Sequence, residues 1–69
     1  MKGNSNMIYT HITRDKKIVQ VANPDAIEIE IDADSRTIKY YARNTVVTVM
    51  QRKNEKGEYE DTAIYISAW

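Results

Sequence analysis

The sequence predicts a small all-β protein that forms a single domain. The chain has 69 residues, which is enough for one domain only. β-Branched and aromatic residues dominate six runs, and the clearest run alternates apolar and acidic residues with a period of two. We therefore expect a six-strand antiparallel meander that forms a small barrel or a two-layer sandwich, because curling of the sheet covers its edge strands.

The six expected strands are separated by polar and turn-forming residues. They span approximately residues 7–13, 17–22, 26–32, 36–43, 45–52 and 60–68. The opening residues 1–6 are polar and offer nothing to bury, so we expect a disordered tail there. The predicted domain therefore comprises residues 7–69.

The first two strands are expected to form a hairpin with Asp15 and Lys16 at its tip. The cross-strand pairs would then be Ile12 with Val19 and Thr10 with Val21. We interpret His11, the only histidine of the chain, as a surface residue of the first strand. Pro24 lacks the N–H that a central strand donates, so it should separate the second strand from the third. The chain is expected to cross between layers there.

The third strand has the clearest alternation. Its apolar residues Ile27, Ile29 and Ile31 fall on one face of a strand, and the residues that alternate with them fall on the other. Those alternating residues are the acids Glu28, Glu30 and Asp32. We expect the three isoleucines to face the core and the acids to face solvent.

The fourth strand is expected to pair with the third around a tip at Asp34 and Ser35. Opposite residues on the apolar face would be Ile31 with Ile38, Ile29 with Tyr40, and Ile27 with Ala42. On the other face Glu30 would meet Lys39, and opposite charges at such positions favour a register. The alternative is an α+β fold with one short helix near residues 35–45 and Ser35 as its N-cap. Strand is favoured, because no Glu or Gln completes a capping box three residues after Ser35.

The fifth and sixth strands are expected to form the last hairpin, with a turn at residues 54–57. Gly57 can supply the positive φ that a type I turn followed by a bulge requires. The valines of the fifth strand would then lie against the segment from Ala63 to Ile66. The pattern does not fix the register of this pair.

The charges cancel overall but are segregated along the chain. Ten basic and ten acidic residues give a net charge of zero. The sums over residues 1–23, 24–35, 36–53 and 54–69 are +3, −5, +5 and −3. The favoured interpretation is attraction between neighbouring antiparallel strands. The alternative is two surfaces of opposite sign, one of which meets a charged partner.

The residues needed for catalysis or for binding a metal are sparse. The chain has no cysteine and one histidine, which excludes disulfides and any standard structural zinc site. No sequence feature brings a serine to His11, as nucleophilic catalysis would require. The acids Glu28, Glu30 and Asp32 are better interpreted as a solvated strand face than as a cation site. We therefore expect no enzymatic activity, no cofactor and no metal.

The aromatic residues are all of the kinds that have a polar group. They are Tyr9, Tyr40, Tyr41, Tyr59, Tyr65 and Trp69. Tyrosine and tryptophan are often the energetic anchors of protein interfaces. By alternation Tyr65 and Trp69 should lie on the outer side of the last strand, with Met50 beside them. These three residues are the predicted protein-binding patch, and the partner is another protein or a second copy of the chain, with a homodimer as an alternative way to cover edge strands.

A second hypothesis assigns nucleic-acid binding to the fourth strand. Tyr41 would lie between Lys39 and Arg43, and an exposed tyrosine between two bases can stack a base of a single strand. The zero net charge makes a nucleic-acid partner less favoured than a protein. No signal-peptide core and no run of the roughly 18 apolar residues of a membrane span are present, so we expect a cytoplasmic protein with no membrane partner.

Overall fold

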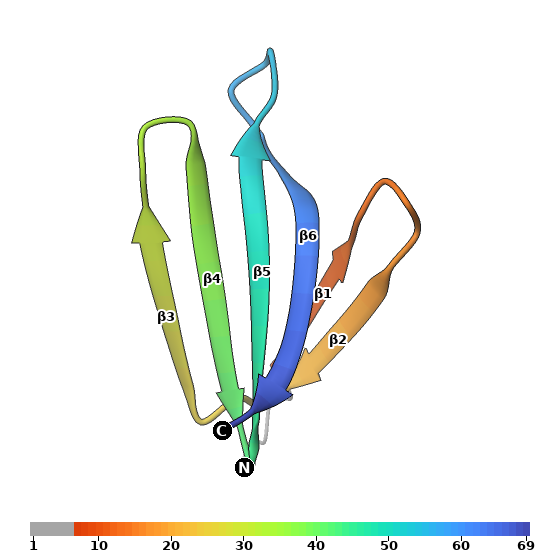
Figure 1. Cartoon of the computed structure of the whole chain (residues 1–69), viewed down its shortest axis with the longest axis vertical. Coiled ribbons are helices and arrows are strands. Elements are labelled where there is room, and N and C mark those ends of the chain that lie inside the picture. The colour runs from red at the N-terminus through yellow and green to blue at the C-terminus, as the bar shows by residue number, and fades with distance from the viewer. Residues whose placement is uncertain (1–6) are drawn as a thin grey trace, which may run out of the picture.

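The computed structural model describes residues 7–69, which form six antiparallel strands (Figure 1). The strands are β1 (Ile8–Ile12), β2 (Ile18–Ala22), β3 (Ala26–Ile31), β4 (Ser35–Ala42), β5 (Thr45–Lys53) and β6 (Tyr59–Ala68). This confirms the all-β fold, and each strand begins and ends within one residue of its predicted bounds. The predicted tail at residues 1–6 lies outside the described residues.

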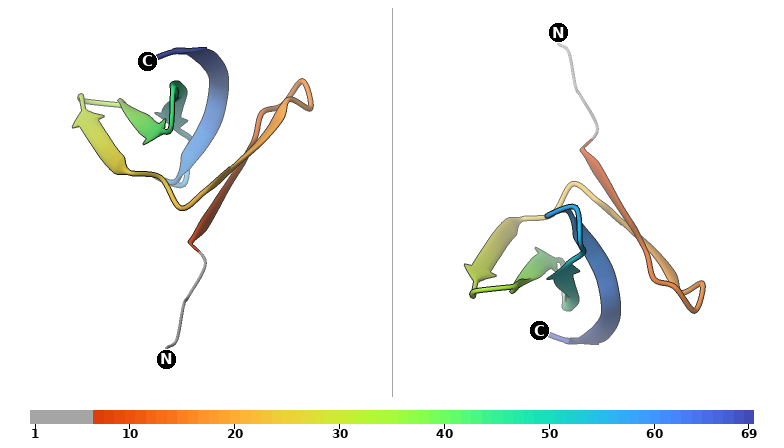
Figure 2. Two further views of the ribbon diagram at one scale, coloured as in Figure 1. Left: turned by 90° about the horizontal axis from the view of Figure 1, so that it is seen from below. Right: turned by 90° about the horizontal axis from the view of Figure 1, so that it is seen from above.

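The six strands divide into two sheets. β1 and β2 form a two-stranded hairpin, and the other four strands form a meander in the order β3-β4-β5-β6. The connection between the sheets runs through Asn23, whose φ is +49°, and Pro24. As predicted, pairing stops there. The hairpin crosses one face of the four-stranded sheet (Figure 2), which we call the inner face, and the opposite face is the outer face.

The helix considered near residues 35–45 is not formed. This segment contains all of β4, the turn at residues 43–44 and the first residue of β5. Within residues 7–69, no helix has the length and apolar character needed to cross a membrane.

A small core lies between the two layers. Its buried hydrophobic residues are Val21, Ile38, Tyr40, Val47 and Val49. Val49, in the middle of β5, is fully buried. Partly buried side chains extend the core, and they are Tyr9, Val19, Ala42 and Ile64. The inner face of β4 and β5 therefore supplies most of the core, and β2 covers it.

The register of the first hairpin differs from the predicted one. The loop has three residues instead of two, because the Thr13 N–H donates to the Lys17 carbonyl at 2.9 Å and Lys16 adopts a φ of +69°. His11 therefore pairs with Val19. A slip of one residue exchanges the two faces of a strand. His11 consequently points inward and is only 9% exposed, so its interpretation as a surface residue was wrong.

The register of β3 and β4 also differs, this time by two residues. The Asp32 N–H donates to the Ser35 carbonyl at 2.8 Å, which places the tip at residues 33–34. The observed pairs include Ile29 with Ile38, Ile27 with Tyr40, and Glu28 with Lys39. The predicted pairs were therefore wrong, although a slip of two residues leaves every side chain on its predicted face.

The expectation that the β3 isoleucines are buried was also wrong. They share the inner face with Ile38 and Tyr40, but Ile27, Ile29 and Ile31 are 40%, 54% and 71% exposed. β3 is an edge strand, and the covering hairpin consists of two strands of only five residues each. The hairpin lies away from β3 (Figure 2), so it leaves this end of the inner face open.

The last hairpin forms at the predicted turn. Gly57 has a φ of +81°, and the Asn54 N–H donates to the Glu58 carbonyl at 2.8 Å. Val47 pairs with Ile66 and Val49 with Ile64 on the inner face. A bulge between Met50 and Gln51 shifts the register, so that Gln51 pairs with Asp61. The bulge thereby turns the Asp61 side chain toward the space between the two sheets.

Candidate functional site

A continuous chain of polar contacts crosses the space between the hairpin and the sheet. His11 Nε2 lies 2.6 Å from the Tyr40 hydroxyl, and His11 Nδ1 lies 3.0 Å from Asp61 Oδ1. Gln51 Nε2 donates to the same Asp61 oxygen at 2.7 Å, and the Arg36 Nε–H donates to Gln51 Oε1. Five side chains from β1, β4, β5 and β6 therefore form one network.

The chemistry of the groups fixes the direction of these bonds. A carboxylate only accepts, so His11 donates from Nδ1 to Asp61. Burial alone would raise the pKa of the Asp61 carboxyl. The hydrogen bonds from Gln51 and His11 outweigh this effect, so the pKa lies below its ordinary value. Burial raises the pKa of the Tyr40 phenol. Asp61 is therefore ionised and Tyr40 neutral near neutral pH.

This network is suited to holding the hairpin against the sheet. Both ring nitrogens of His11 have partners within the protein, and these contacts join β1 to β4 and β6. Asp61 also accepts a bond from the Ile12 N–H at 3.0 Å, which joins it to the β1 backbone. Among the described residues, every fully buried side-chain nitrogen and oxygen has a hydrogen-bond partner. No local sequence pattern indicated this network, because its members are far apart in the chain.

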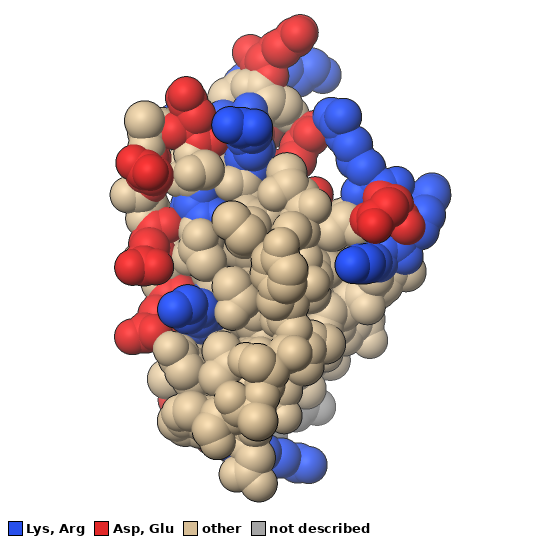
Figure 3. Space-filling model, in the orientation of Figure 1, with Lys and Arg blue, Asp and Glu red and all other residues tan. Residues whose placement is uncertain are grey.

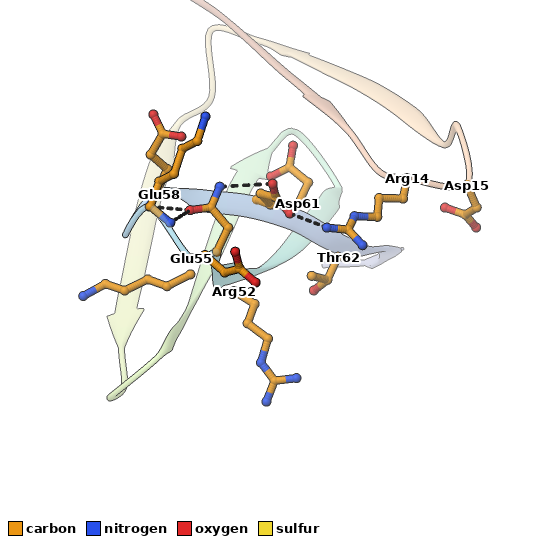
Figure 4. A pocket seen from close by; sticks show the side chains of 11 residues that line it. Arg14, Asp15, Arg52, Glu55, Glu58, Asp61 and Thr62 are labelled. Carbon is orange, nitrogen blue, oxygen red and sulfur yellow. Dashed lines mark hydrogen bonds and ion pairs between the residues drawn. The ribbon is translucent and has the colours of Figure 1, made fainter.

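An open hollow of about 890 Å³ lies beside the network, between the tips of the hairpins β1–β2 and β5–β6 (Figure 4). Arg14 and Glu60 both line the hollow and form an ion pair, with the Arg14 guanidinium 3.0 Å from Glu60 Oε1. The bases of the lining are Arg14, Arg52, Lys53 and Lys56, and the acids are Asp15, Glu55, Glu58, Glu60 and Asp61. Because both signs are mixed, the hollow favours neither anions nor cations.

The outer face carries the predicted patch. Met50, Tyr65 and Trp69 are 42%, 59% and 62% exposed. Tyr65 pairs with Thr48 and Met50 with Ala63, so both side chains lie on the side of the sheet opposite the core. Trp69 follows β6, and its N–H donates to the Asn44 carbonyl at 2.8 Å. Alternation along β6 therefore correctly predicted that Tyr65 lies on the outer side of the sheet.

Two residues of the second predicted set, Lys39 and Tyr41, lie on the same face, and Tyr41 adjoins the first set. The Tyr41 and Trp69 rings have centroids 5.2 Å apart. Lys39 lies further along β4, between Glu28 and Thr48 of the neighbouring strands. The Arg43 N–H donates to Asp25 Oδ2 at 3.1 Å at the β4–β5 turn. The structure therefore places the Tyr41 ring against Trp69, while Lys39 lies two residues away on the same face of β4. We call Tyr41, Met50, Tyr65 and Trp69 the aromatic patch.

Acids border the aromatic patch on the β3 side. The Tyr41 hydroxyl donates to Glu28 Oε1, and this bond raises the pKa of the Tyr41 phenol. Figure 3 shows the acids in a row along β3 and a surface without charged side chains over the middle of β5 and β6. Carboxylates next to Tyr41 and Lys39 repel phosphates, so this geometry does not favour nucleic acid.

Comparison with protein-family models, with curated proteins and with solved structures gives no match for this chain. Among residues 7–69, no group of three or more His, Asp or Glu side chains is arranged to hold a metal ion.

Proposed function

We propose that this chain is a non-enzymatic protein-binding module that binds its partner through the aromatic patch on the outer face. The observation that supports this most directly is the exposure of two large aromatic side chains, Tyr65 and Trp69, on a face whose area over the middle of β5 and β6 carries no charged side chains. Aromatic side chains of this kind contribute most of the binding energy at many interfaces. A partner would remove them from water together with Met50.

The sheet also helps to hold the residues of the aromatic patch in place. Tyr65 lies within β6, paired with β5, and the Trp69 ring contacts Tyr41. Strand pairing limits the backbone freedom of Tyr65, and the contact with Tyr41 limits the freedom of the Trp69 ring, so less freedom is lost on binding, which favours affinity. The β3 acids at the border place a charged rim beside an uncharged centre, as is common for protein interfaces.

Non-enzymatic binding fits the internal polar groups as well. The one histidine has partners on both ring nitrogens and lies in the interior, where it holds the hairpin. An accessory or inhibitor protein needs only a stable surface. Binding of a second copy of the chain through the same patch is the other form of this proposal.

The proposal is tested with Trp69→Ala and Tyr65→Ala. Tagged protein is used to capture partners from native lysate, and light scattering measures the mass of the purified protein. Each variant should lose a partner, or a self-associated form, that the wild-type protein retains. Loss of either aromatic residue is expected to weaken binding about thirtyfold, which is a typical effect of about 2 kcal/mol for an anchor residue.

The control is Ile18→Ala, which truncates another highly exposed apolar side chain on the hairpin, away from the outer face. This control should bind as the wild type does. Circular dichroism and thermal unfolding show whether each variant is folded. If Trp69→Ala unfolds the protein, Trp69 stabilises the fold and the assignment is wrong. Equal capture by all variants would also contradict it.

A further inference from the structure

The free edge of β3 exposes backbone groups that are ready to pair. Within the described part of the chain, β3 pairs only with β4. The Asp32 N–H bonds to the Ser35 carbonyl, and hydrogen-bonded pairs alternate along an antiparallel ladder. Residues of even number in β3 therefore turn their backbone toward β4. The N–H and C=O groups of Ile27, Ile29 and Ile31 are directed toward the free edge.

The side chains of β3 also lack full partners: its isoleucines are partly uncovered, and its acids are not all opposite a base. On the inner face the three isoleucines are 40% to 71% exposed, although the row continues into the core through Ile38 and Tyr40. On the outer face Glu28 has Lys39 opposite, whereas Glu30 has Thr37. Figure 3 shows acids along the whole of this edge. The edge therefore combines an uncovered apolar row with an excess of negative charge.

β4 shows which kind of strand β3 pairs with. Opposite the isoleucines Ile27 and Ile29 it places Tyr40 and Ile38, and opposite Glu28 it places Lys39. β3 presents the same two rows of side chains to its free edge as it presents to β4. These rows are the isoleucines on the inner face and the acids on the outer face. A strand with apolar and basic residues in alternation would therefore extend the apolar face and pair its bases with the acids.

A second copy of β3 does not fit this edge. Directly opposite residues of an antiparallel pair lie on the same face. Every antiparallel register that keeps the isoleucines on one face therefore places acids of one copy opposite acids of the other. In the register centred on Ile29, Glu28 of each copy would face Glu30 of the other. Like charges directly opposite are destabilising, so the acids oppose self-pairing.

We propose that the free edge of β3 binds an extended segment of a partner protein in which apolar and basic residues alternate. The segment adds a fifth strand to the sheet. Its backbone pairs with the N–H and C=O groups of Ile27, Ile29 and Ile31, its apolar side chains cover these isoleucines, and its bases lie beside Glu28, Glu30 and Asp32. This surface adjoins the aromatic patch at Glu28, which accepts a hydrogen bond from the Tyr41 hydroxyl, but the proposal does not depend on the function proposed for that patch.

The probe is a fluorescein-labelled peptide of alternating isoleucine and lysine, and its binding is measured by anisotropy. The full chain should bind it, and affinity should fall as salt screens the charges. A peptide with isoleucine and glutamate in alternation should not bind. A peptide of the same composition in scrambled order, and one with methylated backbone nitrogens on the pairing edge, should bind at least tenfold more weakly. Binding of all four peptides alike, or of none, would overturn the proposal.

Variants of the protein locate the site. Glu30→Gln should weaken binding of the isoleucine–lysine peptide about threefold, the effect of one cross-strand charge pair. Glu55→Gln removes the same charge at the β5–β6 turn and should leave the affinity unchanged. Amide shifts in NMR spectra should be largest at Ile27, Ile29 and Ile31. Equal effects of both variants, or shifts confined to the aromatic patch, would refute binding at β3.

Discussion

His11 and Asp61 are fifty positions apart in the sequence, and their side chains form a hydrogen bond of 3.0 Å between the two sheets. The same carboxylate accepts the Ile12 N–H at 3.0 Å. One acid of β6 therefore holds both a side chain and a backbone group of β1. Because the apolar core is small, this polar contact is an important determinant of where the hairpin lies.

The first prediction concerns the loss of the histidine. His11→Ala leaves the buried Tyr40 hydroxyl without its partner and removes one of the three hydrogen-bond donors of Asp61. The free energy of unfolding should fall by about 2 kcal/mol. Urea denaturation followed by circular dichroism measures it. Thr10→Ala, at the exposed neighbouring position of β1, should change it by less than about 0.5 kcal/mol. Equal losses for the two variants would show that the network contributes nothing.

The second prediction concerns acid. The folded protein holds the pKa of the Asp61 carboxyl below its ordinary value of 3.8. A lowered pKa means that the unfolded chain takes up the proton first, so stability is fully present above pH 3.8 and is lost as the pH falls through the folded pKa. Urea midpoints measured from neutral pH downward should therefore drop most steeply below this value.

The control for the acid prediction removes the titrating group. Asp61→Asn should be less stable at neutral pH and should lose less stability on acidification than the wild type. Glu58→Gln removes a charge at the exposed β5–β6 turn and should retain the wild-type acid dependence. An unchanged slope in Asp61→Asn would mean that other carboxylates cause the acid sensitivity.

The two hairpins differ in how far their loops could be predicted from the sequence. Both have three-residue loops that end in a left-handed residue, Lys16 in one and Gly57 in the other. The glycine signals this conformation, and the turn of the last hairpin was predicted. Lysine gives no such signal, so the predicted loop of the first hairpin is one residue too short. That error reversed the two faces of β1 and concealed the inward position of His11.

The candidate surfaces were predictable to different degrees. Alternation depends only on neighbouring residues, so it gave the outer side for Tyr65 and the separation of isoleucines from acids in β3. The exposure of Ile29 depends on strand order and on the size of the covering layer. β6 has ten residues and β1 only five. A local sequence pattern does not reveal that the hairpin is too small to cover the whole inner face of the sheet.

The third prediction uses the same two loops. Gly57→Ala should lower the free energy of unfolding by about 1 kcal/mol, because a residue with a Cβ is strained at a positive φ. No atom lies near the added methyl group, so the backbone alone causes this loss. Lys16→Gly should stabilise the first hairpin by about 0.5–1 kcal/mol for the converse reason. Thermal unfolding of both variants tests this, and changes of the same sign would contradict it.

The fourth prediction tests whether the acids of β3 prevent self-pairing. Glu30→Lys would convert both Glu28–Glu30 contacts between two antiparallel copies of β3 into opposite-charge pairs, while the exposed isoleucines still lie on one face. We therefore expect this variant to associate, with a mass in sedimentation that rises with concentration and falls with added salt. Glu55→Lys makes the same charge change at the distant β5–β6 turn and should sediment as the wild type does. If both variants sediment as the wild type does, the charges of β3 are not what keeps two copies apart.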